Sequence, residues 1–234
     1  MKQKLVIGGA LFVIAAGAAL YFFWFNPSRL GSRILPLRAW LNNPVAHTDW
    51  SIEAKTRCGE APFLMPSSGY IGFIWHDSFR PGHQHQGIDI FGGAEPGVVP
   101  VYAAYDGYLT RKFGWKSSVI IRLPEDPLNP GQTIWTYYTH MADPSGESYI
   151  VKEFRQGSTE IFVEAGTLLG YQGNYSGTPG KPTGVHLHFS VVKDDGNGSF
   201  LNELEIVNTL DPSPYLGLLL NAKEGGVVPV VCQP

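Results

Sequence analysis

Short runs of β-branched and aromatic residues, separated by turn residues, dominate the chain between residues 70 and 195. The clearest runs occupy residues 98–108, 118–123, 133–139 and 185–192. Each is bounded by Gly, Pro, Asn or Asp, and no long amphipathic helical pattern lies among them. Short strands at this spacing are typical of antiparallel sheets, so the sequence predicts an all-β fold, either a sandwich or a barrel-like structure.

The composition of the 234 residues fits one globular domain with extensions, because 44% are apolar and only 16% are charged. The net charge of −3 argues against nucleic acid as a partner, since nucleic-acid modules carry a basic surplus. The two cysteines are too few for a disulfide-dense fold or a four-cysteine zinc site.

The N-terminus carries an apolar segment, since residues 5–25 contain no charged side chain. As a helix this segment would span roughly the 30 Å hydrocarbon core of a membrane. Tyr21 and Trp24 lie near its end, where interfacial aromatic residues are common, and Pro27 follows. We therefore expect residues 1–25 to form an N-terminal transmembrane helix, so that the membrane is a partner through residues 5–25.

A cleaved signal peptide is the alternative interpretation, because Lys2 and Lys4 supply a charged start. Against it, the apolar run exceeds the usual length of about 7–15 residues, and no small-residue cleavage pattern follows. Arg29, Arg33 and Arg38 flank the other end of the run, so the positive-inside rule does not favour export of the body.

The remaining chain divides by composition into three parts. We expect residues 26–68 to be a juxtamembrane linker with a short helix within 29–43, residues 69–195 to be the β domain, and residues 196–234 to be a C-terminal extension. Cys58 and Cys232 bracket the body and could pair in an oxidising compartment, but sequence spacing does not decide whether they approach each other.

Two histidines share one face of a predicted strand. Residues 185–191 alternate with a period of two, which places His186 and His188 on one side and three apolar side chains on the other. Two imidazoles at this spacing can reach a common point in front of a sheet. The alternative is an exposed polar face on which histidine is merely tolerated.

A second cluster contains His85 and Asp89, which share one face if residues 85–90 are extended. Imidazole and carboxylate are zinc ligands, and three protein ligands with a water are typical of catalytic zinc sites. Gly87 lies between them and is expected to leave room for an ion. The alternatives are a surface loop in which Asp89 pairs with a cation, or a ligand pair that uses His83 instead of His85.

Another histidine, His140, follows the aromatic run 135–139. Taken alone it is more typical of a surface or structural histidine than of a catalytic one. His47 and His76 belong to no pattern, and we expect both to be structural or exposed.

Together these pieces resemble the lysostaphin/LytM-type zinc metallopeptidases, a family of peptidoglycan endopeptidases, over roughly residues 69–192. The family signature is H-x-G-x-D, then a lone histidine after an aromatic strand, then H-x-H. The matching segments here are His85-Gln86-Gly87-Ile88-Asp89, Tyr138-Thr139-His140-Met141 and His186-Leu187-His188. Supporting matches occur at residues 100–107, 164–170 and 183–189.

The resemblance implies an antiparallel β-sandwich with a groove over the sheet and one Zn²⁺ ion bound by His85, Asp89 and His188. It assigns His140 and His186 to catalysis beside the metal. The expected reaction is hydrolysis of a peptidoglycan peptide by a metal-activated water. No H-E-x-x-H motif supplies a glutamate base, so the two histidines would carry the proton.

The chain also departs from the family pattern. Val185 precedes the H-x-H segment where the family more often has Pro, and residues 142–160 form a longer insertion that could wall the groove. A non-catalytic relative that binds the wall or activates other hydrolases is the alternative function. A wall substrate requires the soluble domain to be extracytoplasmic, in the periplasm or at the cell surface.

Overall fold

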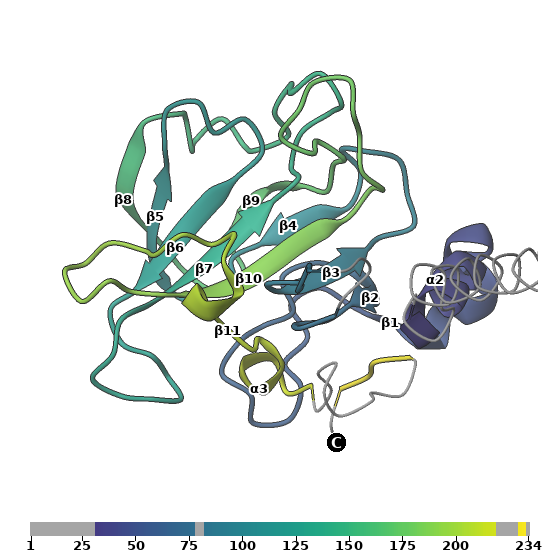
Figure 1. Ribbon diagram of the computed structural model, residues 1–234, viewed down its shortest axis with the longest axis horizontal. Coiled ribbons are helices and arrows are strands. Elements are labelled where there is room, and N and C mark those ends of the chain that lie inside the picture. The colour runs from purple at the N-terminus through teal and green to yellow at the C-terminus, as the bar shows by residue number, and fades with distance from the viewer. Residues whose placement is uncertain (1–30, 78–81, 219–228, 233–234) are drawn as a thin grey trace, which may run out of the picture.

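The computed structural model describes residues 31–77, 82–218 and 229–232, and within them the chain is mainly β (Figure 1). Two helical segments precede the first strand, and a short helix follows the last one. In chain order the elements are α2 (Gly31–Asn42), 3-10 helix η1 (Pro44–Trp50), β1 (Ser51–Ile52), β2 (Gly69–Phe73), β3 (Ile88–Phe91), β4 (Pro100–Tyr102), β5 (Gly107–Arg111), β6 (Val119–Leu123), β7 (Ile134–Thr139), β8 (Ser158–Val163), β9 (Leu168–Tyr171), β10 (Leu187–Lys193), 3-10 helix η2 (Ile206–Asn208), β11 (Thr209–Leu210) and α3 (Ser213–Leu216).

One large sheet has the strand order β1-β2-β3-β10-β7-β6-β5-β8, with β11 added beside β10, and β4 pairs with β9 in a second, small sheet. Every pairing within the described ranges is antiparallel. The predicted mainly antiparallel β fold is therefore confirmed. Residues 98–108, expected as one run, form β4 and the start of β5 in different sheets, because the chain turns between them.

The alternation of side chains along the central strands divides the large sheet into two faces. On β10, Leu187, Phe189 and Val191 are fully buried in the main core, as the period of two predicts. This core also contains Val101 of β4 and Leu169 of β9. The small sheet therefore covers one face of the large sheet, and the main core lies between them.

Two smaller apolar clusters cover opposite ends of the other face of the large sheet. At one end, Leu37 and Trp40 of α2 pack on Tyr70 and Phe91. At the other end, a second cluster contains Ile120, Trp135, Tyr137 and Val192, with Trp115 and Phe200 packed against it. The middle of this face, across β3, β10 and β7, lies between the two clusters.

The described part of the segment expected to be a linker packs on the β domain. The short helix expected within residues 29–43 is present as α2. Further along, β1 pairs with β2, and Phe63 and Met65 are fully buried in the main core. These apolar residues lack strand periodicity, which is why the sequence pattern left them outside the domain.

The described part of the C-terminal extension is also built into the fold. β11 pairs with β10, and Tyr215 of α3 packs against Phe63 with ring centroids 4.9 Å apart. Residues 5–25, expected to cross the membrane, lie outside the described residues. Within the described ranges, no helix combines the length and hydropathy that crossing a bilayer requires.

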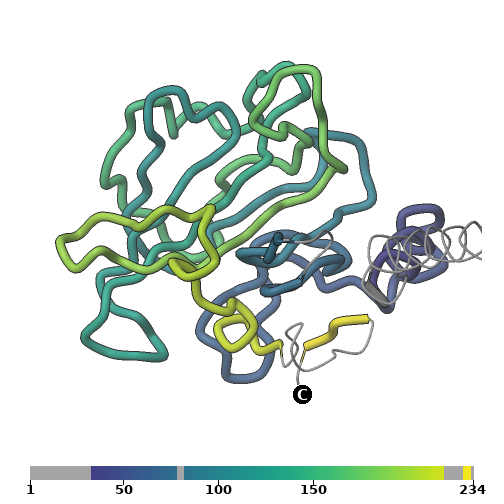
Figure 2. Tube along the Cα trace, in the orientation of Figure 1, coloured from purple at the N-terminus to yellow at the C-terminus, as the bar shows by residue number. Residues whose placement is uncertain are grey.

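A disulfide links the two ends of the body. Cys58 and Cys232 are bonded with their Cα atoms 5.0 Å apart, across 174 residues of sequence. Figure 2 shows the blue stretch after α2 and the yellow C-terminal stretch on the same side of the molecule. The pairing that the sequence left open is therefore present, and disulfides persist in oxidising compartments.

We expect removal of this disulfide to destabilise the fold. Loss of a link across so long a loop costs about 2–5 kcal/mol of unfolding free energy, because the unfolded chain regains entropy. Urea unfolding of a Cys58→Ser, Cys232→Ser double variant, followed by circular dichroism, measures this difference. The double variant should be insensitive to reductant, and equal stability of the wild type with and without reductant would contradict the prediction.

Candidate metal centre and groove

The pairing register places three polar side chains in one row across the middle of the large sheet. Asp89 of β3 lies opposite His188 of β10, and His188 lies opposite Thr139 of β7 on its other side. Their neighbours Ile88 and Phe189 point into the main core. All three polar side chains therefore project from the uncovered face.

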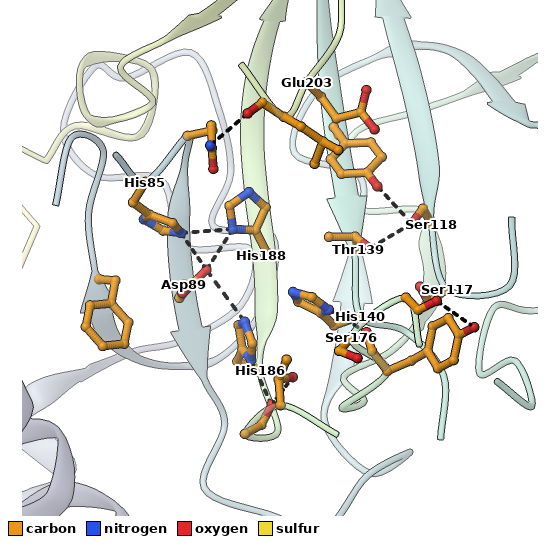
Figure 3. A pocket seen from close by; sticks show the side chains of 18 of the residues that line it. His85, Asp89, Ser117, Ser118, Thr139, His140, Ser176, His186, His188 and Glu203 are labelled. Atoms are coloured by element: carbon orange, nitrogen blue, oxygen red, sulfur yellow. Dashed lines mark hydrogen bonds and ion pairs between the residues drawn. The ribbon is translucent and has the colours of Figure 1, made fainter. Parts of the chain in front are cut away.

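His85 precedes β3 and completes a compact group with Asp89 and His188 (Figure 3). Asp89 Oδ1 lies 3.0 Å from His85 Nε2 and 2.8 Å from His188 Nδ1. The two ring nitrogens lie 3.0 Å apart. Two imidazole nitrogens and one carboxylate oxygen are a donor set that zinc accepts, so the three residues form a candidate metal site.

The second nitrogen of each of these imidazoles has a partner behind it. His85 Nδ1 donates to the Ile74 carbonyl at 3.1 Å, and His188 Nε2 lies 2.8 Å from Ser190 Oγ. The Ile74 carbonyl holds the proton of His85 on Nδ1 and directs the Nε2 lone pair towards a metal, and Ser190 does the same for Nδ1 of His188 when its hydroxyl accepts from Nε2. The hydrogen bonds therefore prepare His85 and His188 as ligands.

The charges in this group favour an ionised carboxylate. Burial acts to raise the pKa of Asp89, but His85 and His186 outweigh it and hold the pKa well below its usual value. Burial opposes protonation of His85, yet the Asp89 carboxylate raises the pKa of this imidazole. Burial lowers the pKa of His188. Asp89 therefore carries a negative charge at neutral pH, as a metal ligand requires.

His140 and His186 lie beside this group (Figure 3). Their ring centroids lie 4.5 Å apart, and His186 Nε2 is 3.6 Å from Asp89 Oδ1. His140 Nδ1 donates to the Tyr175 carbonyl at 2.7 Å, and His186 Nδ1 donates to the Gly184 carbonyl at 2.8 Å. In each ring, Nε2 therefore keeps its lone pair.

Burial gives both of these imidazoles a neutral form at neutral pH. It lowers the pKa of His140 below its usual value and lowers the pKa of His186 to about 4.

His140 also has a φ of 73°, in the left-handed region that non-glycine residues rarely adopt. Strained backbone of this kind occurs often at functional sites.

Gly87 has a role that differs from the expected one. A Cβ on Gly87 would collide with the Phe189 carbonyl oxygen and approach Ser190 Oγ to 2.8 Å. The missing side chain thus lets the segment before β3 lie directly against β10, rather than leaving room for an ion. This close approach brings His85 to His188.

The site opens into a groove of about 800 Å³. Its walls come from residues 114–118, 175–177, 183–184 and 203–204, whereas none of residues 142–160, the expected wall, lines it. On its floor, Tyr137 donates to Ser118 Oγ at 3.0 Å, and Ser118 Oγ lies 2.6 Å from Thr139 Oγ1.

The structure brings together all five side chains that the sequence singled out, and the side chains of the other three histidines lie outside this group. His83 lines the groove but lies outside the three-residue metal group, which contains His85. His47 stacks on Trp50, and His76 contacts Gln84. These placements agree with the choice of His85.

Sequence reasoning missed the residues that support the site. Ile74 and Tyr175 act through backbone carbonyls, which carry no sequence signal. Ser190 lies two residues after His188 on the same strand face, and this spacing could have indicated it. Leu37 of α2 and Glu203 of the C-terminal extension line the groove from segments expected to lie outside the domain.

The chain matches solved structures of M23 lysostaphin- and LytM-type peptidases over most of its length. The antimicrobial peptidase lysostaphin from Staphylococcus simulans shares 20% identity at a TM-score of 0.40, over 68% of this chain and 50% of lysostaphin. Its catalytic domain shares 20% identity at a TM-score of 0.38, over 76% of this chain and 96% of the domain. The catalytic domain of the prophage-encoded M23 protein EnpA from Enterococcus faecalis shares 24% identity at a TM-score of 0.37. The match covers 64% of this chain and 95% of the EnpA domain.

The match to full-length lysostaphin thus spans about half of that protein. No family model matches the chain, and no curated protein matches it.

We expect the metal-depleted chain to bind one Zn²⁺ ion through the Asp89 group. Asp89→Asn keeps the shape of the side chain but removes its charge, so zinc affinity should fall more than about 100-fold. Loss of a residue that only hydrogen-bonds to a ligand costs less than this. Isothermal titration calorimetry measures this affinity. Glu203→Gln, a groove carboxylate outside the group, is the matched control and should bind zinc as the wild type does. Equal affinity in the two variants would overturn the assignment.

Proposed function

We propose that this chain is a zinc metalloendopeptidase of the lysostaphin/LytM type, which hydrolyses peptide cross-links of bacterial peptidoglycan with an activated water. The observation that carries this proposal is the convergence of five side chains on one point. Three of them offer ligand atoms that lie within 4.8 Å of one another, and the two others present Nε2 atoms with free lone pairs. The H-x-G-x-D motif, the lone His140 and the H-x-H motif supply these residues in the order that the family uses.

His85, Asp89 and His188 hold the metal in this proposal. They offer Nε2, Oδ1 and Nδ1, and these three atoms already lie within hydrogen-bond distance of one another. Bound zinc would supply Lewis acidity, which favours ionisation of a water and polarises the scissile carbonyl. The Ile74 carbonyl and Ser190 hold the two imidazoles in the orientation that this role requires.

His140 and His186 move the proton. Each keeps its Nδ1 proton on a backbone carbonyl, so Nε2 can accept a proton from the attacking water. Each can then return a proton to the leaving amine or donate a hydrogen bond to the developing oxyanion. Phe91 stacks on His186 with centroids 5.0 Å apart and limits its rotation.

The groove suits an extended peptide. It passes over the candidate metal site and is lined by Tyr137, Ser118 and Thr139, whose hydroxyl groups are linked by hydrogen bonds. Such groups can hydrogen-bond to the N–H and C=O groups of a substrate main chain, which is uncharged. The wall peptide as the substrate follows from the motif resemblance.

The proposal places residues 69–195 outside the cytoplasm, with residues 1–25 as the membrane anchor, residues 26–68 as the connection and residues 196–234 as an extension. The Cys58–Cys232 disulfide supports an oxidising location. A C-terminal fusion to a phosphatase that matures only outside the cytoplasm should be active. An inactive fusion with a stable chain would contradict this location.

A non-catalytic relative that binds the wall or activates other hydrolases is the competing function. Such a protein does not need a complete set of ligands and proton carriers. All five positions carry suitable side chains here, which favours the enzyme.

We expect His140→Ala to separate metal binding from catalysis. The variant should keep zinc affinity, because His140 is outside the ligand group, yet lose about 10²- to 10⁴-fold in turnover with the proton carrier removed. Digestion of cross-linked muropeptides, followed by chromatography, measures turnover, and a chelator should abolish wild-type cleavage until zinc is restored.

His83→Ala is the matched control, because His83 lines the same groove outside the group and its loss should leave turnover near that of the wild type. Unchanged turnover of His140→Ala would remove its catalytic role. A wild-type chain that binds zinc and cleaves no muropeptide would favour the non-catalytic relative.

A further inference from the structure

A buried arginine links helix α2 to the segment that carries the metal ligand His85. Arg33 is only 4% exposed, and its Nε lies 3.3 Å from Asp77 Oδ2. Its Nη1 has no hydrogen-bond partner in the described part of the chain. A buried ion pair of this kind ties together the two segments that it joins, because breaking it leaves an uncompensated buried charge.

Asp77 transmits this contact to the turn formed by residues 74–77. The same Oδ2 atom accepts a hydrogen bond from the Ile74 N–H at 2.8 Å. The Asp77 carbonyl accepts from the His85 N–H, and the His85 carbonyl accepts from the His76 N–H, both at 2.8 Å. The turn is thus bonded to the backbone of His85 on both sides.

The turn also contacts the imidazole of His85. The Ile74 carbonyl accepts the Nδ1 proton of His85 at 3.1 Å, which leaves Nε2 for the metal. A hydrogen bond or ion pair therefore forms each step from Arg33 through Asp77 and Ile74 to His85. A carbonyl behind a metal-binding histidine fixes its tautomer and ring orientation.

Helix α2 supports the other side of the site through apolar contacts. Leu37 and Trp40 pack in one cluster with Tyr70 and Phe91. The Phe91 ring stacks on His186 with an interplanar angle of 20°. Helix α2 therefore reaches both a ligand and a proton carrier, from a segment outside the residues that carry the family resemblance.

We propose that helix α2 is a positioning element of the metal site, in which Arg33 acts through Asp77 and the Ile74 carbonyl to orient His85. This inference rests on the proposed function, because it concerns the ligand that would hold zinc. Arg33 and Asp77 touch neither the metal nor the substrate in this proposal. Their effect is on how well His85 is prepared.

The test compares zinc affinities of the full chain carrying Arg33→Met, Arg33→Lys or Asp77→Asn, by competition with a chromophoric chelator. Loss of an outer partner of a ligand typically weakens metal binding about 10- to 100-fold, and we expect this loss for Arg33→Met and Asp77→Asn. Arg33→Lys keeps a cation for Asp77 and should recover most of the affinity. The double variant that carries both Arg33→Met and Asp77→Asn removes both charges, so neither charge is left buried without its partner. It therefore remains measurable if a single variant fails to fold, and it should also bind zinc weakly.

Two further measurements separate positioning from general stability. Asp126 is buried and accepts a hydrogen bond from Tyr215 at 2.9 Å. It follows the C-terminal end of β6, whereas the groove residue Ser118 precedes the N-terminal end of this strand. Asp126→Asn should lower the unfolding free energy while leaving zinc affinity unchanged. In the metal-free chain, at a pH above the raised pKa of His85, nitrogen NMR should show the remaining proton on Nδ1 in the wild type, and a mixture of Nδ1 and Nε2 tautomers in Arg33→Met.

The outcomes distinguish this inference from the proposed function. If the wild type binds zinc and Arg33→Met and Asp77→Asn bind it equally well with an unchanged His85 tautomer, the positioning role is overturned and the proposed function stands. If the wild type binds no zinc, the proposed function fails. In that case an unchanged His85 tautomer in Arg33→Met overturns the positioning role as well.

Discussion

His188 of β10 lies directly opposite Asp89 of β3, and the rest of the site depends on this register. Because side chains alternate between the faces of a sheet, a slip of one residue would turn either group towards the main core. The apolar residues Leu187 and Phe189 prevent such a slip, since each is fully buried between the two sheets. Hydrophobic packing on one face of β10 thus holds the polar group on the other.

The open face of the large sheet is shaped by what covers it. One apolar cluster, built on Tyr70 and Phe91, lies under α2, and a second, built on Trp135 and Tyr137, lies under Trp115 and Phe200. The groove occupies the interval between them and is lined from both sides, by Leu37 and by Trp115. The segments outside the central strands therefore shape the site as well as stabilise the fold.

The sequence predicted the parts of this structure that depend on local periodicity and on motifs. The alternation in residues 185–191 predicted which side chains of β10 face the core, and the three histidine segments predicted the group that converges. The role of Gly87 was not predictable, because it depends on how closely the segment before β3 approaches Phe189. The division of residues 98–108 between two sheets likewise depends on tertiary packing.

Long-range contacts account for most of what the sequence did not indicate. The Arg33–Asp77 ion pair joins a helix to a distant turn, and neither residue belongs to a motif. Burial of Phe63 and Met65 depends on contacts with distant residues of the main core, which their local sequence does not specify. Backbone carbonyls such as those of Ile74 and Tyr175 complete the site without any requirement on residue type.

The most direct test of the metal centre is anomalous X-ray diffraction from zinc-soaked crystals, with data collected on both sides of the zinc absorption edge. We expect one anomalous peak per chain, bonded to His85 Nε2, Asp89 Oδ1 and His188 Nδ1 at about 2.0–2.2 Å. A peak elsewhere, or one held without the Asp89 carboxylate, would contradict the assignment of this group as the metal site.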